Sequence, residues 1–302
     1  MTSTTFTLRT RRLSNALGAE IIGLDLSRPL AGDVLREVRA IWVQYGVVLF
    51  RGQQALTPAQ HIEFSQCFGE VDRNDNAPTY RMPGYPELVE VTNRDIGGKP
   101  SLTRNLGRSW HSDLEYTLRP ALATLLWCEQ VPDVGGDTQF AHMGNAWDAV
   151  SPGMQKMLRG LEAEYDIKLG VRPKEADGSF DEIHGHNVSV AQPLVREHPE
   201  SGRTSLFASD RIDRFVGWTR DESMPLLHYL MKVATHPENV LRHRWQPGDL
   251  VMWDNRCVIH QALADYDRSQ VRYMRRSAVM GEPSGYTVRG DASVLARETD
   301  AH

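Results

Sequence analysis

The sequence predicts a mainly β protein with flanking helices, built on a jelly-roll core. Nine short segments have the composition of strands, whereas only four segments carry helical signals. Turn residues such as Pro247-Gly248-Asp249 separate neighbouring strands. Many short strands with a few flanking helices are typical of a sandwich or jelly roll. No change of composition marks a linker, so residues 1–302 are expected to form a single domain.

The four helices are predicted from apolar spacing and from capping residues. Apolar residues recur at helical spacing between 34 and 42, which predicts a helix over 33–45. Thr57-Pro58 and Ser151-Pro152 each place a capping hydroxyl before a proline at the first helical position. The first of these two helices is expected to close at Gly69, and the second to run over 154–161. Thr219, followed by acidic residues, opens a helix that runs to about residue 235.

The strands are predicted from short apolar and β-branched runs. They cover residues 47–50, 123–129, 138–141, 188–190, 204–208, 240–245, 250–253, 257–260 and 272–280. Two long stretches, 72–109 and 170–185, show no periodicity. Loops of that length inside a compact domain are often functional. We therefore expect these two stretches to act as lid segments.

Composition excludes several classes of protein. The net charge is −5 and the basic residues are scattered, so no nucleic-acid partner is expected. No apolar run approaches the roughly 20 residues of a membrane helix, and residues 1–12 lack the apolar part of a signal peptide. Three cysteines at unrelated spacings argue against a disulfide scaffold. We expect a cytoplasmic homo-oligomer with no membrane partner.

The run Trp110-His111-Ser112-Asp113 indicates a metal site. On an extended strand, His111 and Asp113 would point to the same face. His260, at the end of a distant predicted strand, would add a second imidazole. Two imidazoles and one carboxylate on one side of the ion form the facial triad of non-haem Fe(II) oxygenases, which leaves positions open for a cosubstrate and O₂.

A second motif, Arg272-Tyr273-Met274-Arg275-Arg276, indicates an anion pocket. Arg272 and Arg276 would share one strand face, and two guanidiniums inside a protein are costly unless anions meet them. Arginine grips carboxylates in a bidentate manner, which fixes their orientation. Arg275 would lie on the opposite face, at the surface. Gly135-Gly136 is expected to be a turn that precedes Thr138.

A further motif is the run Gly248-Asp249-Leu250-Val251-Met252-Trp253-Asp254-Asn255-Arg256. Together with the motifs above, it makes the sequence similar to a known enzyme family. The sequence resembles the taurine dioxygenase/2,4-dichlorophenoxyacetate dioxygenase family of Fe(II)- and 2-oxoglutarate-dependent dioxygenases. The resemblance implies a double-stranded β-helix fold, a jelly-roll variant. It also implies that His111, Asp113 and His260 bind Fe(II). Thr138 and Arg272 would hold the distal carboxylate of 2-oxoglutarate, and Arg276 would grip the substrate's acidic group.

Such an enzyme would use O₂ to hydroxylate a C–H bond of a small anionic substrate, releasing succinate and CO₂. An aryloxyalkanoate-like carboxylate is favoured, with ether cleavage where oxygen adjoins the hydroxylated carbon; an alkyl sulfate or sulfonate is the alternative. Phe68-Gly69 is followed by no histidine of the kind that helps family members bind taurine, which argues against taurine as the substrate.

Two other classes of protein stay open. A zinc-dependent hydrolase would need no Thr138–Arg272 pair, and a non-catalytic jelly-roll binding protein would need neither metal nor inward arginines.

Overall fold

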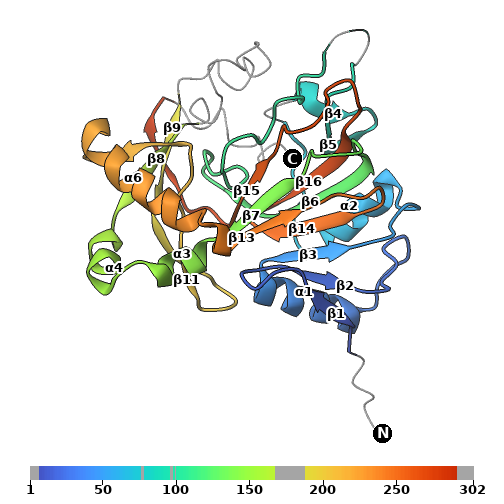
Figure 1. Ribbon diagram of the computed structural model, residues 1–302, viewed down its shortest axis with the longest axis horizontal. Helices are drawn as coiled ribbons and strands as arrows, with labels where there is room; N and C mark the ends of the chain where they lie inside the picture. Colours follow the sequence, from blue (N-terminus) through green and yellow to red (C-terminus); the bar gives the residue numbers. More distant parts are fainter. Residues whose placement is uncertain (1–6, 76–77, 96–97, 99, 167–187, 291–302) are drawn as a thin grey trace, which may run out of the picture.

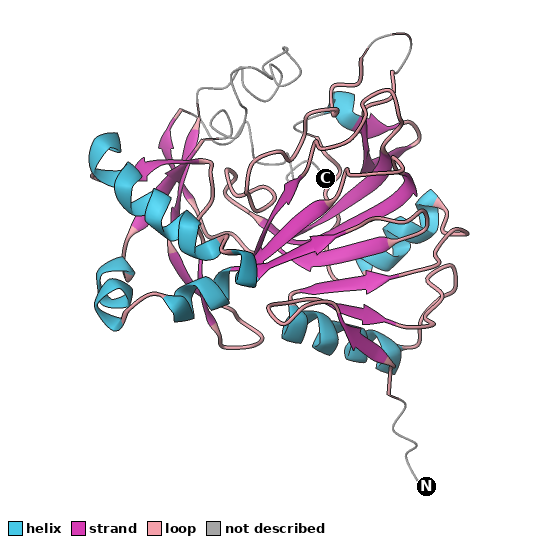
Figure 2. Ribbon diagram, in the orientation of Figure 1, coloured by secondary structure: helices cyan, strands magenta, loops and turns pink. Residues whose placement is uncertain are grey.

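The computed structural model describes residues 7–75, 78–95, 98, 100–166 and 188–290. The structure is mixed α/β and rich in strands, which form several antiparallel sheets. Figure 2 shows the strands gathered in the middle of the molecule and the helices around them. The helices are α1 (Gly32–Tyr45), α2 (Pro58–Gln66), α3 (Met143–Ala149), α4 (Pro152–Leu158) and α6 (Arg220–Ala234), with 3-10 turns at Pro78–Tyr80 and Pro237–Asn239.

The largest sheet has eight strands. In spatial order they are β1 (Thr10–Arg12), β2 (Ala19–Ile21), β3 (Val47–Phe50), β14 (Leu250–Asp254), β6 (Ala121–Gln130), β16 (Tyr273–Met280), β5 (Tyr85–Thr92) and β4 (Arg81–Met82). Only the β2–β3 pair is parallel among the described strands. Most neighbouring strands of this sheet are distant from each other in the sequence. The sheet thus brings together residues near 50, 125, 252 and 276.

Three smaller sheets complete the fold. The central one contains β13 (Val240–His243), β7 (Thr138–His142) and β15 (Val258–Ala262); the next contains β12 (Ile212–Phe215), β8 (Glu162–Tyr165), β9 (Ser189–Pro193) and β17 (Tyr286–Arg289); the last pairs β10 (Val195–Glu197) with β11 (Thr204–Leu206). Figure 1 shows the three-stranded sheet between the eight-stranded sheet and the group of β8, β9, α3, α4 and α6.

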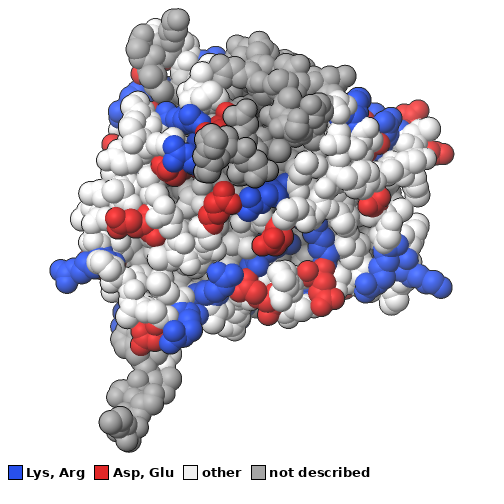
Figure 3. Space-filling view, turned by 180° about the vertical axis from the view of Figure 1, so that it is seen from behind, with Lys and Arg blue, Asp and Glu red and all other residues white. Residues whose placement is uncertain are grey.

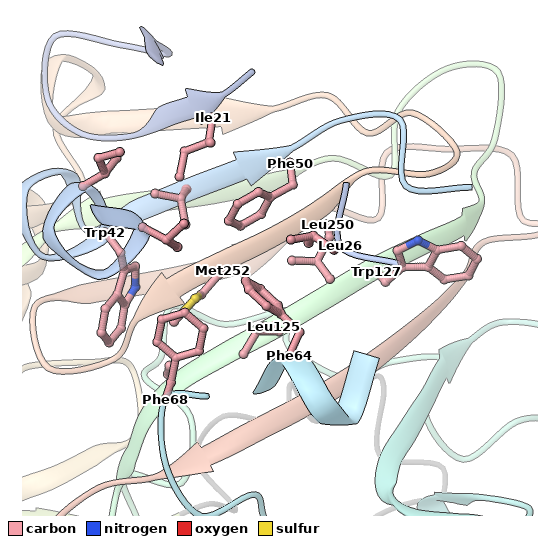
Figure 4. Close-up of a cluster of buried hydrophobic side chains, with 14 of the residues drawn as sticks. Ile21, Leu26, Trp42, Phe50, Phe64, Phe68, Leu125, Trp127, Leu250 and Met252 are labelled. Carbon is pink, nitrogen blue, oxygen red and sulfur yellow. The ribbon is translucent and has the colours of Figure 1, made fainter. Parts of the chain in front are cut away.

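One apolar core fixes α1 and α2 to the eight-stranded sheet. Helix α1 buries Val38, Ile41 and Trp42 on a single stripe, as its apolar spacing predicts. Figure 4 shows Trp42 and Phe68 next to the sheet residues of this cluster. Their rings meet edge to face with centroids 5.9 Å apart. This well-packed core therefore stabilises the eight-stranded sheet.

Replacing Trp42 by alanine is expected to destabilise the protein by about 3–5 kcal/mol, because the indole is fully buried and its loss leaves a large cavity. The free energy of unfolding from urea titration, followed by far-ultraviolet circular dichroism, measures the change. Tyr229→Ala is the matched control, since that ring is 43% exposed. An equal effect of both substitutions would contradict the assignment of Trp42 to this core.

Most helical predictions are confirmed, but two helices end early, and α4 stops at Leu158 rather than at residue 161. Thr57 and Thr219 cap α2 and α6, and both form capping boxes with the residue three positions later. Helix α2 ends at Gln66 rather than near Gly69. The cause is a tighter last turn, in which the backbone N–H of Cys67 donates to the carbonyl of Phe64.

The expectation of an irregular segment over 72–109 is wrong in part. This segment contains β4 and β5, and β5 pairs with β16 inside the eight-stranded sheet. The strand was hard to recognise because Pro86 and two glutamates interrupt its apolar residues, which face the interior only in part. The second expected lid segment, 170–185, lies outside the described residues.

Arg275 is another correction, because it is buried rather than at the surface. Only 4% of the residue is exposed. Its guanidinium lies 3.8 Å from the centre of the Trp127 ring and donates to the carbonyl of Leu56 over 2.8 Å. The reason is topological: β16 lies inside the sheet and α2 covers this face of it.

The surface shows a mixed charge distribution on the face drawn in Figure 3, where acidic and basic side chains are interspersed. Among the described residues, none of the helices has both the length and the apolar character needed to cross a membrane.

Candidate active site

His111 and His260 are brought together by their own backbones. They form an isolated antiparallel bridge, in which each N–H donates to the other's carbonyl over 3.1 and 2.9 Å. Paired residues of an antiparallel bridge project their side chains to the same side. The two imidazole rings accordingly lie with their centroids 4.1 Å apart. Because His260 belongs to β15, the three-stranded sheet holds this pair in place.

Asp113 reaches the same point from a turn rather than from a strand. The expected extended strand over 111–113 is reduced to the single bridge residue His111, and Leu114 follows with a left-handed φ of 56°. The backbone N–H of Asp113 donates to Asn255 Oδ1 over 3.0 Å, and its carbonyl accepts from Ala121. These bonds turn the chain while keeping the carboxylate beside the two histidines.

The three side chains fit a single metal ion. His111 Nε2 lies 3.8 Å from one Asp113 oxygen, and His260 Nε2 lies 3.8 Å from the other. Metal–nitrogen and metal–oxygen bonds of about 2.0–2.2 Å let one ion bridge atoms at this separation. His111 Nδ1 lies 2.8 Å from the carbonyl of Ser109. That carbonyl accepts the Nδ1 proton, so the lone pair of Nε2 faces Asp113.

Electrostatics favour the protonation states that a metal needs. Burial, helped by Arg211, holds the pKa of His111 well below its usual value. Burial likewise lowers the pKa of His260 to about 4, with Arg211 and Arg276 adding to the effect. Burial would raise the pKa of Asp113, but Arg276 and both histidines together lower it below its usual value. At neutral pH the site therefore presents two neutral imidazoles and one carboxylate, a net charge suited to a divalent cation.

Two residues orient Asp113, and no pattern in the sequence predicts this role for them. Thr124 Oγ1 donates to Asp113 Oδ2 over 2.7 Å. Asn255 Nδ2 in turn donates to Thr124 Oγ1 over 2.9 Å, and all three residues are buried. Asn255 lies in a motif recognised from the sequence, whereas Thr124 looks like any β-branched residue of a buried strand. Hydrogen bonds behind a ligand fix its orientation.

Thr124→Val is expected to weaken metal binding about 10- to 100-fold, the usual effect of losing a hydrogen bond to a ligand. Valine keeps the shape of threonine but removes the donor to Asp113. Competition between the protein and a calibrated chelator for Mn(II) measures the affinity. Thr117→Val is the matched control, because the Thr117 hydroxyl donates only to the carbonyl of Leu114. Unchanged affinity in Thr124→Val would remove Thr124 from this role.

Thr138 begins β7 directly after the Gly135-Gly136 turn, as expected. Both glycines have positive φ, and a Cβ on Gly135 would lie 2.2 Å from the carbonyl oxygen of Asp265. Thr138 Oγ1 accepts a 3.0 Å hydrogen bond from Trp245 Nε1. Accepting this bond does not use the hydroxyl proton of Thr138, which therefore remains available for an anion.

Arg272 lies beside this turn. Its Nε donates to the carbonyl of Gly136 over 3.0 Å, and the residue is 6% exposed. Burial lowers the pKa of Arg272, although nearby groups including Tyr266 and Asp137 oppose the shift. Among the described residues no carboxylate lies within 4.0 Å of its guanidinium. An arginine held this way is prepared to receive an anion.

The residues predicted from the sequence line one cavity of about 110 Å³. The sequence-predicted residues on its wall are His111, Asp113, His260, Thr138, Arg272 and Arg276. Arg276 Nη1 donates to Asp113 Oδ1 over 3.0 Å, while its Nε has no hydrogen-bond partner within the described part of the chain. The expectation that Arg272 and Arg276 face the same space is confirmed. In the segment 72–109, Tyr80 lines the cavity, whereas Arg73 pairs with Glu87 at the surface.

The sequence did not reveal the charged pair Glu115 and Arg211. Arg211 lines the same cavity, and Glu115 lies directly behind it, 1% exposed. Burial raises the pKa of Glu115 to about 7, against the lowering effects of Arg211 and of hydrogen bonds from Ser112 and Ser209. No motif marks these two residues, because their proximity depends on how β12 is placed relative to the turn after His111.

Proteins with similar sequences include 2-oxoglutarate-dependent enzymes, in agreement with this site. The sequence model of the family "Taurine catabolism dioxygenase TauD, TfdA family" matches residues 9–278. This chain belongs to the TauD/TfdA family. Among its relatives is the (S)-phenoxypropionate/alpha-ketoglutarate-dioxygenase of Sphingobium herbicidovorans, 34% identical over 281 residues, which cover 91% of this chain and 96% of that one. The alkylsulfatase of Acinetobacter baylyi is 30% identical over 91% of this chain and 86% of that one.

A solved structure supports the same conclusion. The crystal structure of AAD-2 in complex with Mn(II) and N-oxalylglycine aligns with a TM-score of 0.82 and 31% identity, covering 92% of this chain and 99% of that one. N-oxalylglycine is an analogue of 2-oxoglutarate. The protein is thus an α-ketoglutarate-dependent dioxygenase that uses a metal ion and 2-oxoglutarate, as the sequence motifs predicted.

Proposed function

We propose that His111, Asp113 and His260 hold Fe(II), and that Thr138 and Arg272 hold the distal carboxylate of 2-oxoglutarate. The observation that carries this proposal is the convergence of these residues on one cavity, with both imidazoles neutral and directed at one carboxylate. The zinc hydrolase and the binding-protein alternatives offer no reason for a buried arginine and a threonine hydroxyl that are both available to an anion.

The roles of the protein groups follow from their contacts. Fe(II) with 2-oxoglutarate and O₂ supplies the oxidising chemistry, which converts 2-oxoglutarate to succinate and CO₂ and hydroxylates a C–H bond. Thr138 and Arg272 would fix the far end of the cosubstrate and so set its orientation. Thr124 and Asn255 would keep Asp113 in place. Apolar residues such as Leu106, Leu126 and Trp253 line the cavity, and they would exclude water from the reacting groups.

The proposed substrate is a small organic acid with an apolar body. Arg276 would bind the acidic group, and the wall formed by Tyr80, Val89 and Leu114 would contact a ring or an alkyl chain. Relatives are named for phenoxypropionate, 2,4-dichlorophenoxyacetate, alkyl sulfates and sulfonates. An aryloxyalkanoate-like carboxylate, with ether cleavage after hydroxylation, is the first proposal, and an alkyl sulfate or sulfonate is the second.

The finer fold assignment belongs to the same proposal. The eight-stranded and three-stranded sheets would form a double-stranded β-helix, and residues 1–302 a single domain. Residues of both sheets line the cavity, among them Thr138 from β7 and Arg276 from β16, and this supports the assignment. We also propose a homo-oligomer, which sedimentation equilibrium would test.

Substrate-dependent formation of succinate tests the function. Purified protein with Fe(II), ascorbate and 2-oxoglutarate is incubated with phenoxyalkanoates, alkyl sulfates and alkyl sulfonates, and succinate and O₂ consumption are measured. We expect one acid class to stimulate both, in equal amounts. Hydrolysis of an ester substrate with zinc, without O₂ consumption, would contradict the proposal and favour the hydrolase.

Arg276→Gln is expected to reduce the preference of the enzyme for an acid over its amide by about 10-fold or more, since a hydrogen bond to a charged group contributes about 1.5–3 kcal/mol. The measurement is substrate-triggered O₂ uptake with phenoxyacetate and phenoxyacetamide. Arg289→Gln is the matched control, because Arg289 is exposed and outside the cavity. If Arg276→Gln keeps the wild-type preference, another residue holds the anion.

A further inference from the structure

Arg211 brings a third guanidinium into the cavity, from a different sheet than Arg272 and Arg276. It directly precedes β12, and its backbone is held at both ends. Its N–H donates to Ser209 Oγ over 3.1 Å, and its carbonyl accepts from the N–H of Asp166 over 2.9 Å. The residue is 8% exposed and lines the same cavity as the two histidines. These bonds therefore hold the backbone of Arg211 at the cavity wall.

The guanidinium of Arg211 donates no hydrogen bond to another residue within the described part of the chain. Its Nε has no partner among the described residues. The closest carboxylate oxygen, Glu115 Oε1, lies 3.8 Å from Nη1, which is longer than a hydrogen bond of about 2.7–3.2 Å. Both Glu115 oxygens already accept other hydrogen bonds, one from Ser112 N over 3.1 Å and one from Ser209 Oγ over 2.9 Å. Donors at a cavity wall without a protein acceptor are free to bind an anion that enters the cavity.

The other two arginines of the cavity each have an acceptor within the protein for one of their donors. Arg272 donates to the carbonyl of Gly136, and Arg276 donates to Asp113. In the proposed function, the metal and the Thr138–Arg272 pair account for the two carboxylates of 2-oxoglutarate. A positive charge beside a metal site is unfavourable unless an anion neutralises it. The acidic group of the primary substrate is the remaining anion of the reaction.

We propose that Arg211 donates hydrogen bonds to the acidic group of the primary substrate and acts with Arg276 to select anionic substrates. This inference rests on the proposed function, because it assigns one more residue to the same substrate. Glu115 and Ser209 would orient the guanidinium from behind, which leaves its remaining donors for the substrate. A carboxylate or a sulfate offers at least two oxygens and so can accept from both arginines.

Binding measured without turnover tests the proposal. Wild type, Arg211→Met and Arg211→Lys are loaded with Mn(II) and N-oxalylglycine, and calorimetry gives dissociation constants for four probes. Two probes are acids, (S)-2-phenoxypropionate and hexyl sulfate. Their neutral counterparts are the amide of (S)-2-phenoxypropionate and hexyl methyl ether. We expect Arg211→Met to bind the preferred acid at least about 10-fold more weakly, while the neutral probe is affected less than about twofold. Arg211→Lys should keep part of the acid preference. The two acids distinguish a carboxylate from a sulfate substrate.

Several results would overturn the proposal, and they are distinguishable. A wild type that binds neither acid better than its neutral counterpart rejects the proposed anionic substrate, and this inference with it. A wild type with an acid preference that Arg211→Met retains rejects this inference alone. Equal weakening of the acid, its neutral counterpart and N-oxalylglycine in Arg211→Met and Arg211→Lys would show that Arg211 only maintains the structure.

Discussion

Asp113→Ala is expected to lower turnover by more than about 100-fold while the fold remains intact. Asp113 is the carboxylate that both histidines approach at 3.8 Å, and without it only two ligands would remain. Losing a group that merely supports a ligand already costs 10- to 100-fold in metal affinity, so losing the ligand itself should cost more. His111→Ala and His260→Ala should have effects of the same order. Iron content and succinate formation of each purified variant are the measurements.

His228→Ala is the matched control for these variants, because His228 is an exposed histidine on α6, away from the cavity. Circular dichroism and thermal unfolding establish whether each variant is folded. Near wild-type turnover of any one of the three variants at saturating Fe(II) would remove that residue from the metal site.

Arg272→Ala should raise the Michaelis constant for 2-oxoglutarate by roughly 30-fold or more, far beyond its effect on the primary substrate. A charge-assisted contact in a desolvated site is worth roughly 2–5 kcal/mol when its anion is left behind, and each 1.4 kcal/mol is a factor of ten. The variant also removes the bond to the carbonyl of Gly136, so the turn beside Thr138 loses support. Initial rates at varied 2-oxoglutarate and varied substrate separate the two effects.

Arg268→Ala provides the control for Arg272, since this exposed arginine lies four residues earlier in the same segment. Thr138→Val should act in the same direction but more weakly, because it removes only one hydroxyl donor. Unchanged dependence on 2-oxoglutarate in both Arg272→Ala and Thr138→Val would show that the cosubstrate's distal carboxylate is held elsewhere.

The sequence predicted the site better where the information was local. The motif around His111 and Asp113 identified two residues that the structure brings together, although a turn rather than a strand does so. Thr138 and Arg272 line the same cavity, because a turn and a strand end place each of them there. His260 joins them through a long-range bridge, which the resemblance implied but periodicity alone could not.

Residues whose role depends on distant packing were missed. Arg275 looked like a surface residue because strand alternation cannot reveal that α2 covers the second face of β16. Arg211 and Thr124 carry no motif, and their importance comes from neighbours about 100 and 130 residues away in sequence, respectively Glu115 and Asn255. Similarly, β5 was hidden by its proline and glutamates, although pairing with β16 determines its conformation.

The most direct test of the central proposal is the crystal structure of the protein with Mn(II), N-oxalylglycine and an acid substrate, with the ion located by its anomalous scattering. We expect one ion bonded to His111, Asp113 and His260 at about 2.0–2.2 Å. The distal carboxylate of N-oxalylglycine should lie on Thr138 and Arg272, and the substrate's acidic group should contact Arg276 and Arg211. An ion bonded to a different set of residues, or N-oxalylglycine bound away from Arg272, would contradict the account.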